Sequence, residues 1–100
     1  AWRAIYADIC EMKRVFVPRR FKGSGIGRQL CETLIASARE HGFGSMKLDT
    51  GHRMSEAIAL YTELGFRDCE PYLDYPEQML PHFRFMALSL NPAIDPVRPR

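Results

Sequence analysis

The chain has 100 residues, of which 46% are hydrophobic and 26% are charged, and these values are typical of one small globular domain. They exclude a disordered tail, a fibrous repeat and a low-complexity array. The sequence has no run of about 18 apolar residues, so no membrane-spanning helix is predicted. No secretory leader is visible either, and we expect a cytoplasmic protein. Cys10, Cys31 and Cys69 are odd in number and widely spaced, which indicates buried, reduced thiols and neither a disulfide framework nor a metal site.

The net charge of +2 hides a strong asymmetry along the chain. Residues 13–28 contain six lysines and arginines and no acid, so the remaining residues carry a net charge of −4. Because glycines lie inside this cationic segment, it favours a compact anion such as a phosphate ester over a long polyanion.

Two strands, a glycine-rich loop and a helix are predicted in the first half of the chain. β-forming residues indicate strands at 2–7 and 10–17, and the alternation changes parity at Lys13 and Arg14, as a β-bulge would produce. The loop follows over 18–25. A helical period then runs over 26–41 and stops before a glycine. Its expected inner face consists of Ile26, Leu30, Leu34 and Ala38, with Cys31 and Ile35 beside them.

The second half alternates between strands and a shorter helix. An alternating pattern predicts a strand at 45–50, and Ser55 is the expected N-cap of a helix over 57–64. A short strand at 66–70, a proline-containing irregular loop at 71–81 and a buried strand at 82–90 follow. The last ten residues, 91–100, contain three prolines and form a predicted tail outside the domain of residues 1–90.

This order of elements predicts an α/β fold with one mixed sheet. Strands joined through helices favour a central parallel pair with helices packed on the sheet. The edges are expected to be mostly antiparallel, because the final two strands are joined without a helix.

The junction between the second strand and the first helix has the features of an anion site. Lys22-Gly-Ser-Gly-Ile-Gly-Arg28 precedes the helix, whose first N–H groups have no partner within the helix. The dinucleotide fingerprint would need glycine at position 28 or 30, where arginine and leucine stand, and no Gly-Lys-Ser/Thr string of a P-loop occurs. The alternative is a glycine-rich turn that binds no ligand.

Two motifs resemble hallmarks of the GNAT superfamily of N-acetyltransferases. Lys22-x-x-Gly25-x-Gly27 is similar to the Arg/Gln-x-x-Gly-x-Gly/Ala signature of that superfamily. Downstream, Tyr61-x-x-Leu-Gly65-Phe66 resembles its second hallmark, a helix that ends in Tyr-x-x-x-Gly-Phe. The resemblance covers residues 10–90 and implies a GNAT-like fold that binds acetyl-CoA without a metal, but lacks the N-terminal strands and helices.

The resemblance also implies which residues bind the acetyl donor. The pyrophosphate of acetyl-CoA would lie on the glycine loop, and the pantetheine arm would pair with the strand before it. The cofactor-binding residues implied are Val15, Phe16, Val17, Lys22, Gly23, Ser24, Gly25, Ile26, Gly27, Arg28 and Tyr61. The amide of Val17 would stabilise the oxyanion that forms on the acetyl carbonyl.

The implied reaction is acetyl transfer from acetyl-CoA to a primary amine by direct attack. Glu11 aligns with a position that sometimes supplies the base, and Tyr61 aligns with the frequent general acid. Each has a structural alternative: Glu11 as a solvated residue or an ion-pair partner of Lys13 or Arg14, and Tyr61 as a packing residue. The three histidines, His41, His52 and His82, are expected at the surface.

Three departures from the family pattern bear on these expectations. Lys22 replaces the planar guanidinium or amide of the signature, and Met54 stands where the second hallmark often has asparagine. Only nine residues precede Cys10, where the family normally has a strand, helices and two further strands. A non-catalytic CoA-binding fragment is therefore the alternative to an enzyme, a homodimer is a possible assembly, and a nucleic-acid binder is disfavoured because Phe16 and Phe21 are the only aromatic residues of the cationic segment.

Overall fold

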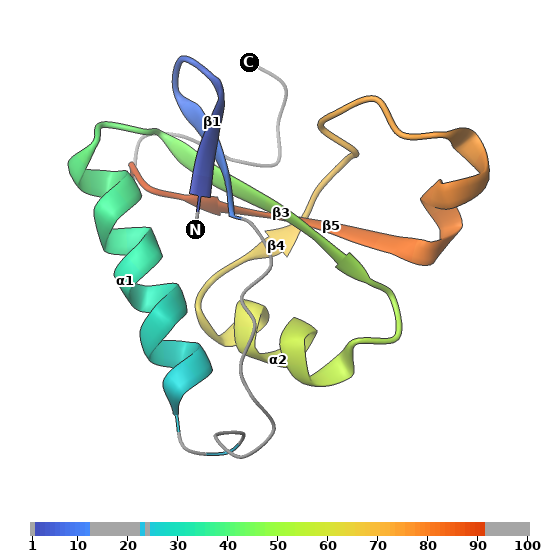
Figure 1. Ribbon diagram of the computed structural model, residues 1–100, viewed down its shortest axis with the longest axis horizontal. Helices are drawn as coiled ribbons and strands as arrows, with labels where there is room; N and C mark the ends of the chain where they lie inside the picture. The colour runs from blue at the N-terminus through green and yellow to red at the C-terminus, as the bar shows by residue number, and fades with distance from the viewer. Residues whose placement is uncertain (1, 13–22, 24, 92–100) are drawn as a thin grey trace.

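The computed structural model of the chain describes residues 2–12, 23 and 25–91. The described strands form one sheet in the order β1-β2-β3-β5-β4 (Figure 1). The strands are β1 (Trp2–Tyr6), β2 (Ile9–Met12), β3 (Ser45–Gly51), β4 (Arg67–Asp68) and β5 (Phe83–Ser89). The helices are α1 (Ile26–Glu40), α2 (Ser55–Glu63) and the short 3₁₀ helix η2 (Glu77–His82).

The sheet is mixed, as predicted. β2 and β3 are parallel, with Glu11 opposite Lys47 in the register. The other pairs, β1–β2, β3–β5 and β4–β5, are antiparallel. The parallel pair follows from the α1 crossover, because a chain that leaves β2 must return through a helix to lie beside it in the same direction.

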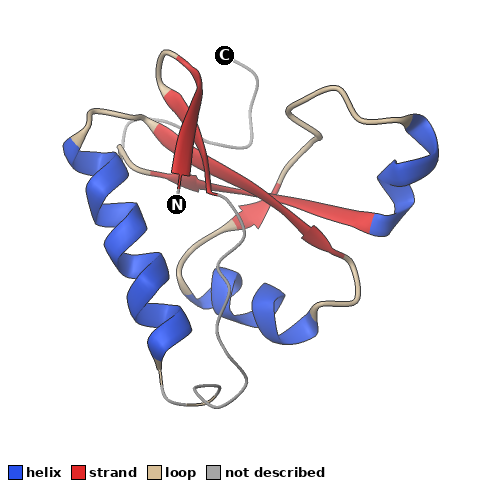
Figure 2. Ribbon diagram, viewed as in Figure 1, coloured by secondary structure: helices blue, strands red, loops and turns tan. Residues whose placement is uncertain are grey.

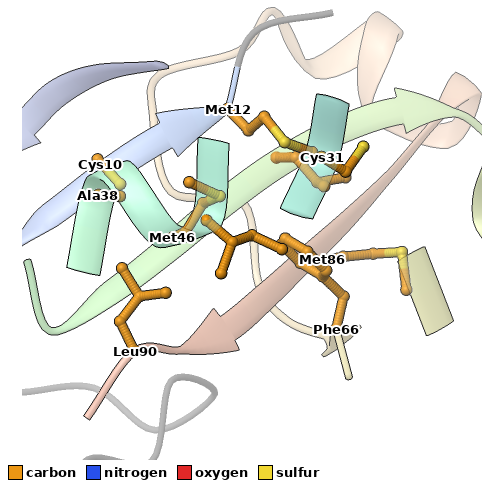
Figure 3. Packing of buried hydrophobic residues seen from close by; sticks show 10 residues of the cluster. Cys10, Met12, Cys31, Ala38, Met46, Phe66, Met86 and Leu90 are labelled. Carbon is orange, nitrogen blue, oxygen red and sulfur yellow. The ribbon is translucent and has the colours of Figure 1, made fainter. Parts of the chain in front are cut away.

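One face of the sheet carries the hydrophobic core, shown in Figure 3. Alternation in β2 and β3 directs Cys10, Met12, Met46 and Leu48 to this face, and each is buried. α1 covers it with Cys31, Ile35 and Ala38, and α2 with Leu60, Tyr61 and Leu64. Fully burying a side chain of this size stabilises the fold by about 1.5–3 kcal/mol.

Several local predictions need correction. Leu30 was expected on the inner face of α1 but is 43% exposed, while Cys31 and Ile35 face the core. Ser55 is the first residue of α2 and Met54 is its N-cap, with no side-chain cap. Part of the loop expected to be irregular forms η2 at the start of β5 (Figure 2).

Other expectations are confirmed or fall outside the described residues. Cys10 and Cys31 are buried free thiols, Cys69 is a half-buried one, and the three histidines are exposed. The bulge predicted at Lys13 and Arg14 lies outside the described residues. A register irregularity is found instead in the first hairpin, between Ala4 and Tyr6. Within the described ranges, neither α1 nor α2 has both the length and the apolar composition that a membrane span requires.

Candidate functional site

α1 begins after a glycine whose backbone has the left-handed conformation. Gly25 is the N-cap residue with φ +86°, and its carbonyl accepts the first helical hydrogen bond from the Gln29 amide at 3.0 Å. Gly23 has a similar φ of +84°. The first turn of α1 carries no acidic residue. This end of the helix therefore presents backbone N–H groups and partial positive charge without an acid in that turn to oppose an incoming anion.

The glycine turn is also open to an incoming group. A Cβ atom built on Gly23 or Gly25 would meet no atom of the described residues within 4 Å, so the need for glycine here is conformational, and both glycines are exposed. These two glycines, with Ile26, Gly27 and Arg28, are the described part of the predicted donor-binding set. The remaining members, Val15, Phe16, Val17, Lys22 and Ser24, lie outside the described residues.

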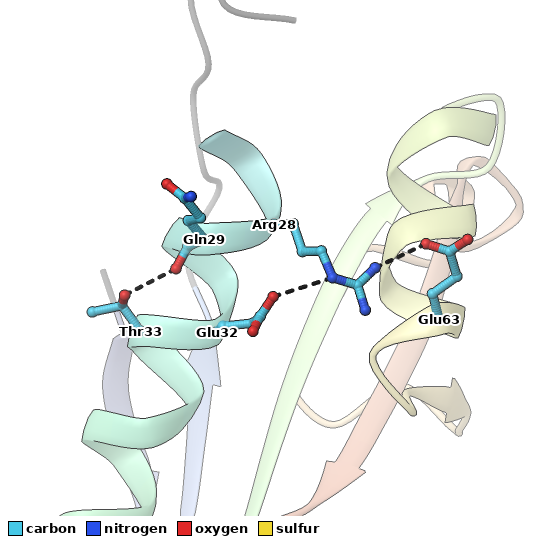
Figure 4. A network of polar contacts seen from close by, with 5 residues as sticks. All are labelled: Arg28, Gln29, Glu32, Thr33 and Glu63. Atoms are coloured by element: carbon cyan, nitrogen blue, oxygen red, sulfur yellow. Dashed lines mark hydrogen bonds and ion pairs between the residues drawn. The ribbon is translucent and has the colours of Figure 1, made fainter. Parts of the chain in front are cut away.

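Arg28 joins the two helices that flank this turn (Figure 4). Its Nε donates to Glu32 of α1 and its Nη1 donates to Glu63 of α2, both at 3.1 Å. All three side chains are about half exposed or more, and such ion pairs contribute little to stability because water competes for them. Arg28 can therefore exchange these carboxylates for a phosphate at small cost.

Tyr61 lies on α2, two residues before the Glu63 that Arg28 contacts. Its half-buried ring packs against the core, edge-on to Phe66 with 5.7 Å between the ring centroids. The backbone around it is fixed by the amide of Phe66, which donates to the Tyr61 carbonyl at 2.9 Å. The Arg28 bridge thus joins the helix that carries Tyr61 to the first turn of α1, which follows the glycine turn.

Glu11 is a buried carboxylate and not a solvated strand residue. It is 5% exposed, and Arg3 Nε of the neighbouring strand donates to its Oε1 at 2.9 Å. The hydroxyl of Tyr72 donates to its Oε2 at 2.7 Å. Glu11 forms an ion pair with Arg3, a partner that was not expected. The expected partners Lys13 and Arg14 lie outside the described residues, so that pairing stays a prediction.

Glu11 and Tyr61 lie on opposite faces of the sheet. Glu11 has the opposite parity to Cys10 and Met12, which face the core that Tyr61 joins. Side chains on the two faces can meet only at a gap between strands or at the end of the sheet. The structure therefore places Tyr61 on a helix that Arg28 joins to α1, but does not bring Tyr61 to Glu11.

A second phenol–carboxylate pair lies beside the first. The hydroxyl of Tyr75 donates to Asp49 Oδ2 at 2.6 Å. Burial, followed by the hydrogen bonds to Glu11 and Asp49, raises the pKa of both the Tyr72 and Tyr75 phenols well above the ordinary value. Both tyrosines therefore stay protonated and act as donors at neutral pH.

Sequence reasoning missed Tyr72 and Tyr75, because they lie in the loop that was expected to be irregular. Two tyrosines three residues apart within a proline-containing loop are the signal that could have found them, since aromatic residues in a loop often anchor it to the body of a domain. Over the described residues, no group of three or more histidine, cysteine or acidic side chains is arranged to hold a metal ion.

Comparison with known proteins identifies related sequences. The sequence model of the Acetyltransferase (GNAT) family matches residues 2–66. An N-acetyltransferase of Dictyostelium discoideum is 44% identical over 68% of this chain and 32% of its own length. One from Schizosaccharomyces pombe is 34% identical over 82% of this chain and 48% of its own. The chain thus spans about half or less of the length of these relatives.

Solved structures share the fold. An acyl-CoA N-acyltransferase from Klebsiella pneumoniae aligns with a TM-score of 0.74 and 32% identity, over 83% of this chain and 56% of the other. The acetyltransferase yncA from Salmonella typhimurium, solved with acetyl-CoA, aligns with a TM-score of 0.72 and 25% identity, over 95% of this chain and 57% of its own. These alignments match the mixed sheet and its helices to chains that are longer than this one.

Proposed function

The chain belongs to the Acetyltransferase (GNAT) family, and from this premise we propose that it transfers the acetyl group of acetyl-CoA to a primary amine. The observation that carries the proposal is the left-handed glycine turn at the N-terminus of α1, open to an anion and joined through Arg28 to the helix of Tyr61. The acetyl-CoA held by the Salmonella relative supports the choice of donor.

In this proposal the donor is bound by main-chain groups of the loop. The amides from Gly23 to Arg28, Ser24 included, hold the pyrophosphate, and Lys22 and Arg28 add positive charge. The strand segment Val15-Phe16-Val17 pairs with the pantetheine arm, and the Val17 amide donates to the acetyl oxygen as negative charge develops on it.

The chemical step needs a base and an acid. The amine nitrogen attacks the acetyl carbonyl carbon, a C–N bond forms and the C–S bond breaks. Glu11 receives a proton from the attacking amine, and the Tyr61 hydroxyl protonates the departing thiolate, so the products are an amide and CoA. Because Glu11 and Tyr61 lie on opposite faces of the sheet, both can reach one tetrahedral centre only at a gap between strands or at the end of the sheet. The proposal therefore requires the acetyl group to lie at such a gap or end.

Three attributes of the proposal concern the whole protein. Residues 1–90 form the acetyl-CoA-binding domain, and residues 91–100 form a tail. Three free thiols favour a reducing compartment, which we take to be the cytoplasm. The acceptor is a small molecule or protein amine, and a homodimer is one candidate assembly.

The test is a transfer assay with acetyl-CoA and a panel of amines: a polyamine, an aminoglycoside, free amino acids and a peptide with a free N-terminus. We expect CoA thiol to appear in step with the acetylated amine, detected by mass spectrometry, and little release when amine is omitted. If acetyl-CoA binds saturably but no amine is acetylated, the described chain is instead a non-catalytic CoA-binding module. Absence of both binding and turnover would contradict the proposal.

A further inference from the structure

The loop between β4 and β5 places two phenols on two carboxylates of neighbouring strands. Tyr72 donates to Glu11 of β2 at 2.7 Å, and Tyr75 donates to Asp49 of β3 at 2.6 Å. The first of these bonds joins residues 61 positions apart in the chain. The loop is therefore tied to the sheet face opposite the helices through the side chain proposed as the base.

Packing holds the Tyr72 hydroxyl in place. Tyr72 is 8% exposed, and its ring lies edge-on to Phe85 with 6.1 Å between centroids. Tyr75 packs edge-on against the same Phe85 at 4.9 Å. The loop is also anchored before these rings, because the Cys69 amide donates to the Phe85 carbonyl at 2.9 Å. A hydroxyl fixed by a buried ring is a preorganised donor, unlike one on an exposed side chain.

We propose that Tyr72 is a positioning residue that fixes the orientation and the ionised state of the Glu11 carboxylate. This inference rests on the proposed function, in which Glu11 receives the proton of the amine. With Arg3 on Oε1 and Tyr72 on Oε2, the carboxylate is held from both sides. These two bonds favour the ionised form of the carboxylate, which is the form that can receive a proton.

The charges around Glu11 set the sign of the expected effect. The phenol hydrogen bond stabilises the ionised carboxylate, so its removal makes the carboxylate easier to protonate. The titratable and charged groups on the described elements around Glu11 are Arg3 of β1, Lys47 and Asp49 of β3, and Tyr72 and Tyr75 of the loop. Tyr72→Phe leaves Arg3, Lys47 and Asp49 in place, but it also changes the surroundings of Tyr75, which Tyr72 contacts.

The variant that tests the inference is Tyr72→Phe, which keeps the buried ring and removes the hydroxyl. We expect kcat/KM to fall about five- to tenfold, the worth of one typical net hydrogen bond. We expect the acidic limb of the pH–rate profile to move about 0.5–1 pH unit higher. Because the phenol does not touch the donor, acetyl-CoA affinity should stay within about twofold.

Tyr75→Phe is the matched control, because it removes the hydroxyl on Asp49 from the same loop. It should move the acidic limb less than Tyr72→Phe does, because Tyr75 contacts Tyr72 but donates to Asp49 and not to Glu11. Glu11→Gln supplies a second control: if Tyr72 acts through Glu11, adding Tyr72→Phe to Glu11→Gln causes no further loss of turnover. An acidic limb that stays in place in Tyr72→Phe, or shifts equally in Tyr75→Phe, would overturn the inference, as would additive losses in the double variant.

A measurement without turnover separates this inference from the proposed function. The side-chain carboxyl carbon of Glu11 can be followed by ¹³C nuclear magnetic resonance as pH is varied, and its midpoint should rise in Tyr72→Phe by the same 0.5–1 unit or so. An unchanged midpoint overturns the inference even if the enzyme is active. A raised midpoint in a protein with no transferase activity refutes the catalytic role and the proposed reaction together.

Discussion

The residues that contact Glu11 come from parts of the sequence that are far apart. Its place on a strand follows from local alternation, but its partners are Arg3 on the adjacent strand and Tyr72 from a distant loop. Both partners depend on how strands and loop assemble, so no local pattern predicts them. The same holds for Arg28, which was expected to face phosphate and which contacts two carboxylates, one of them 35 residues away.

Removing the Tyr61 hydroxyl tests the proposed general acid. Tyr61→Phe keeps the ring that packs on Phe66, so the stability of the fold should change by no more than about 1 kcal/mol. Turnover should fall about 10–100-fold, because the thiolate loses its proton donor. Steady-state kinetics checks this, with Tyr6→Phe as the control, since Tyr6 is 56% exposed on β1. Equal turnover in Tyr61→Phe and the unmodified protein would remove the acid role.

At the scale of elements, periodicity and end signals predicted most of the fold. The helix expected over 26–41 is α1, and the strands expected at 45–50 and 82–90 are β3 and β5 within a residue or two of their ends. The errors are physical. Leu30 lies at the edge of the apolar stripe of α1, where a small rotation of the helix exposes its side chain. η2 is a short 3₁₀ helix, too short to show a helical repeat of apolar residues in the sequence.

The junction from α2 to β4 depends on Gly65, which has φ +104°. A Cβ atom there would also lie 3.2 Å from Leu88 Cδ1, so Gly65→Ala combines backbone strain with a close contact. Gly42 has φ +85° but open space around its would-be Cβ, so Gly42→Ala carries the strain alone.

Chemical denaturation should therefore show a loss of about 1–2 kcal/mol for Gly42→Ala and about 1–2 kcal/mol more for Gly65→Ala. Equal losses would show that Leu88 moves aside without cost.

For the whole molecule, the mixed sheet could be predicted but its strand order could not. A strand–helix–strand order implied the parallel β2–β3 pair, and the lack of a helix implied antiparallel β4 and β5. Nothing in the sequence placed β5 between β3 and β4, because that arrangement depends on long-range pairing. Of the candidate site, the glycine turn and Tyr61 were found through motifs, whereas the Tyr72 and Tyr75 bonds depend on tertiary contacts.

The buried thiols predict a loss of stability in alkali. Burial raises the pKa of Cys10 from 9.0 to about 11. Above pH 9 the unfolded chain loses this proton while the folded protein keeps it, so the free energy of unfolding falls as pH rises towards 11. The slope from one such group is at most about 1.4 kcal/mol per pH unit.

Denaturation of the unmodified protein and of Cys10→Ala between pH 8 and 11 measures this contribution. The variant should be less stable at pH 8 because of the cavity, but should lose less stability on going to high pH. Parallel curves would show that Cys10 ionises equally in both states.

The most direct test of the central claim is calorimetric titration of acetyl-CoA into the protein and into two glycine variants. Gly25→Val places a branched side chain at the start of α1, and Gly42→Val imposes a comparable left-handed strain beyond the far end of the same helix. We predict saturable binding to the unmodified protein and to Gly42→Val, and a loss of at least about tenfold in affinity for a folded Gly25→Val. Equal affinity in Gly25→Val and Gly42→Val, or no binding to the unmodified protein, would contradict the assignment of the glycine turn as the donor site.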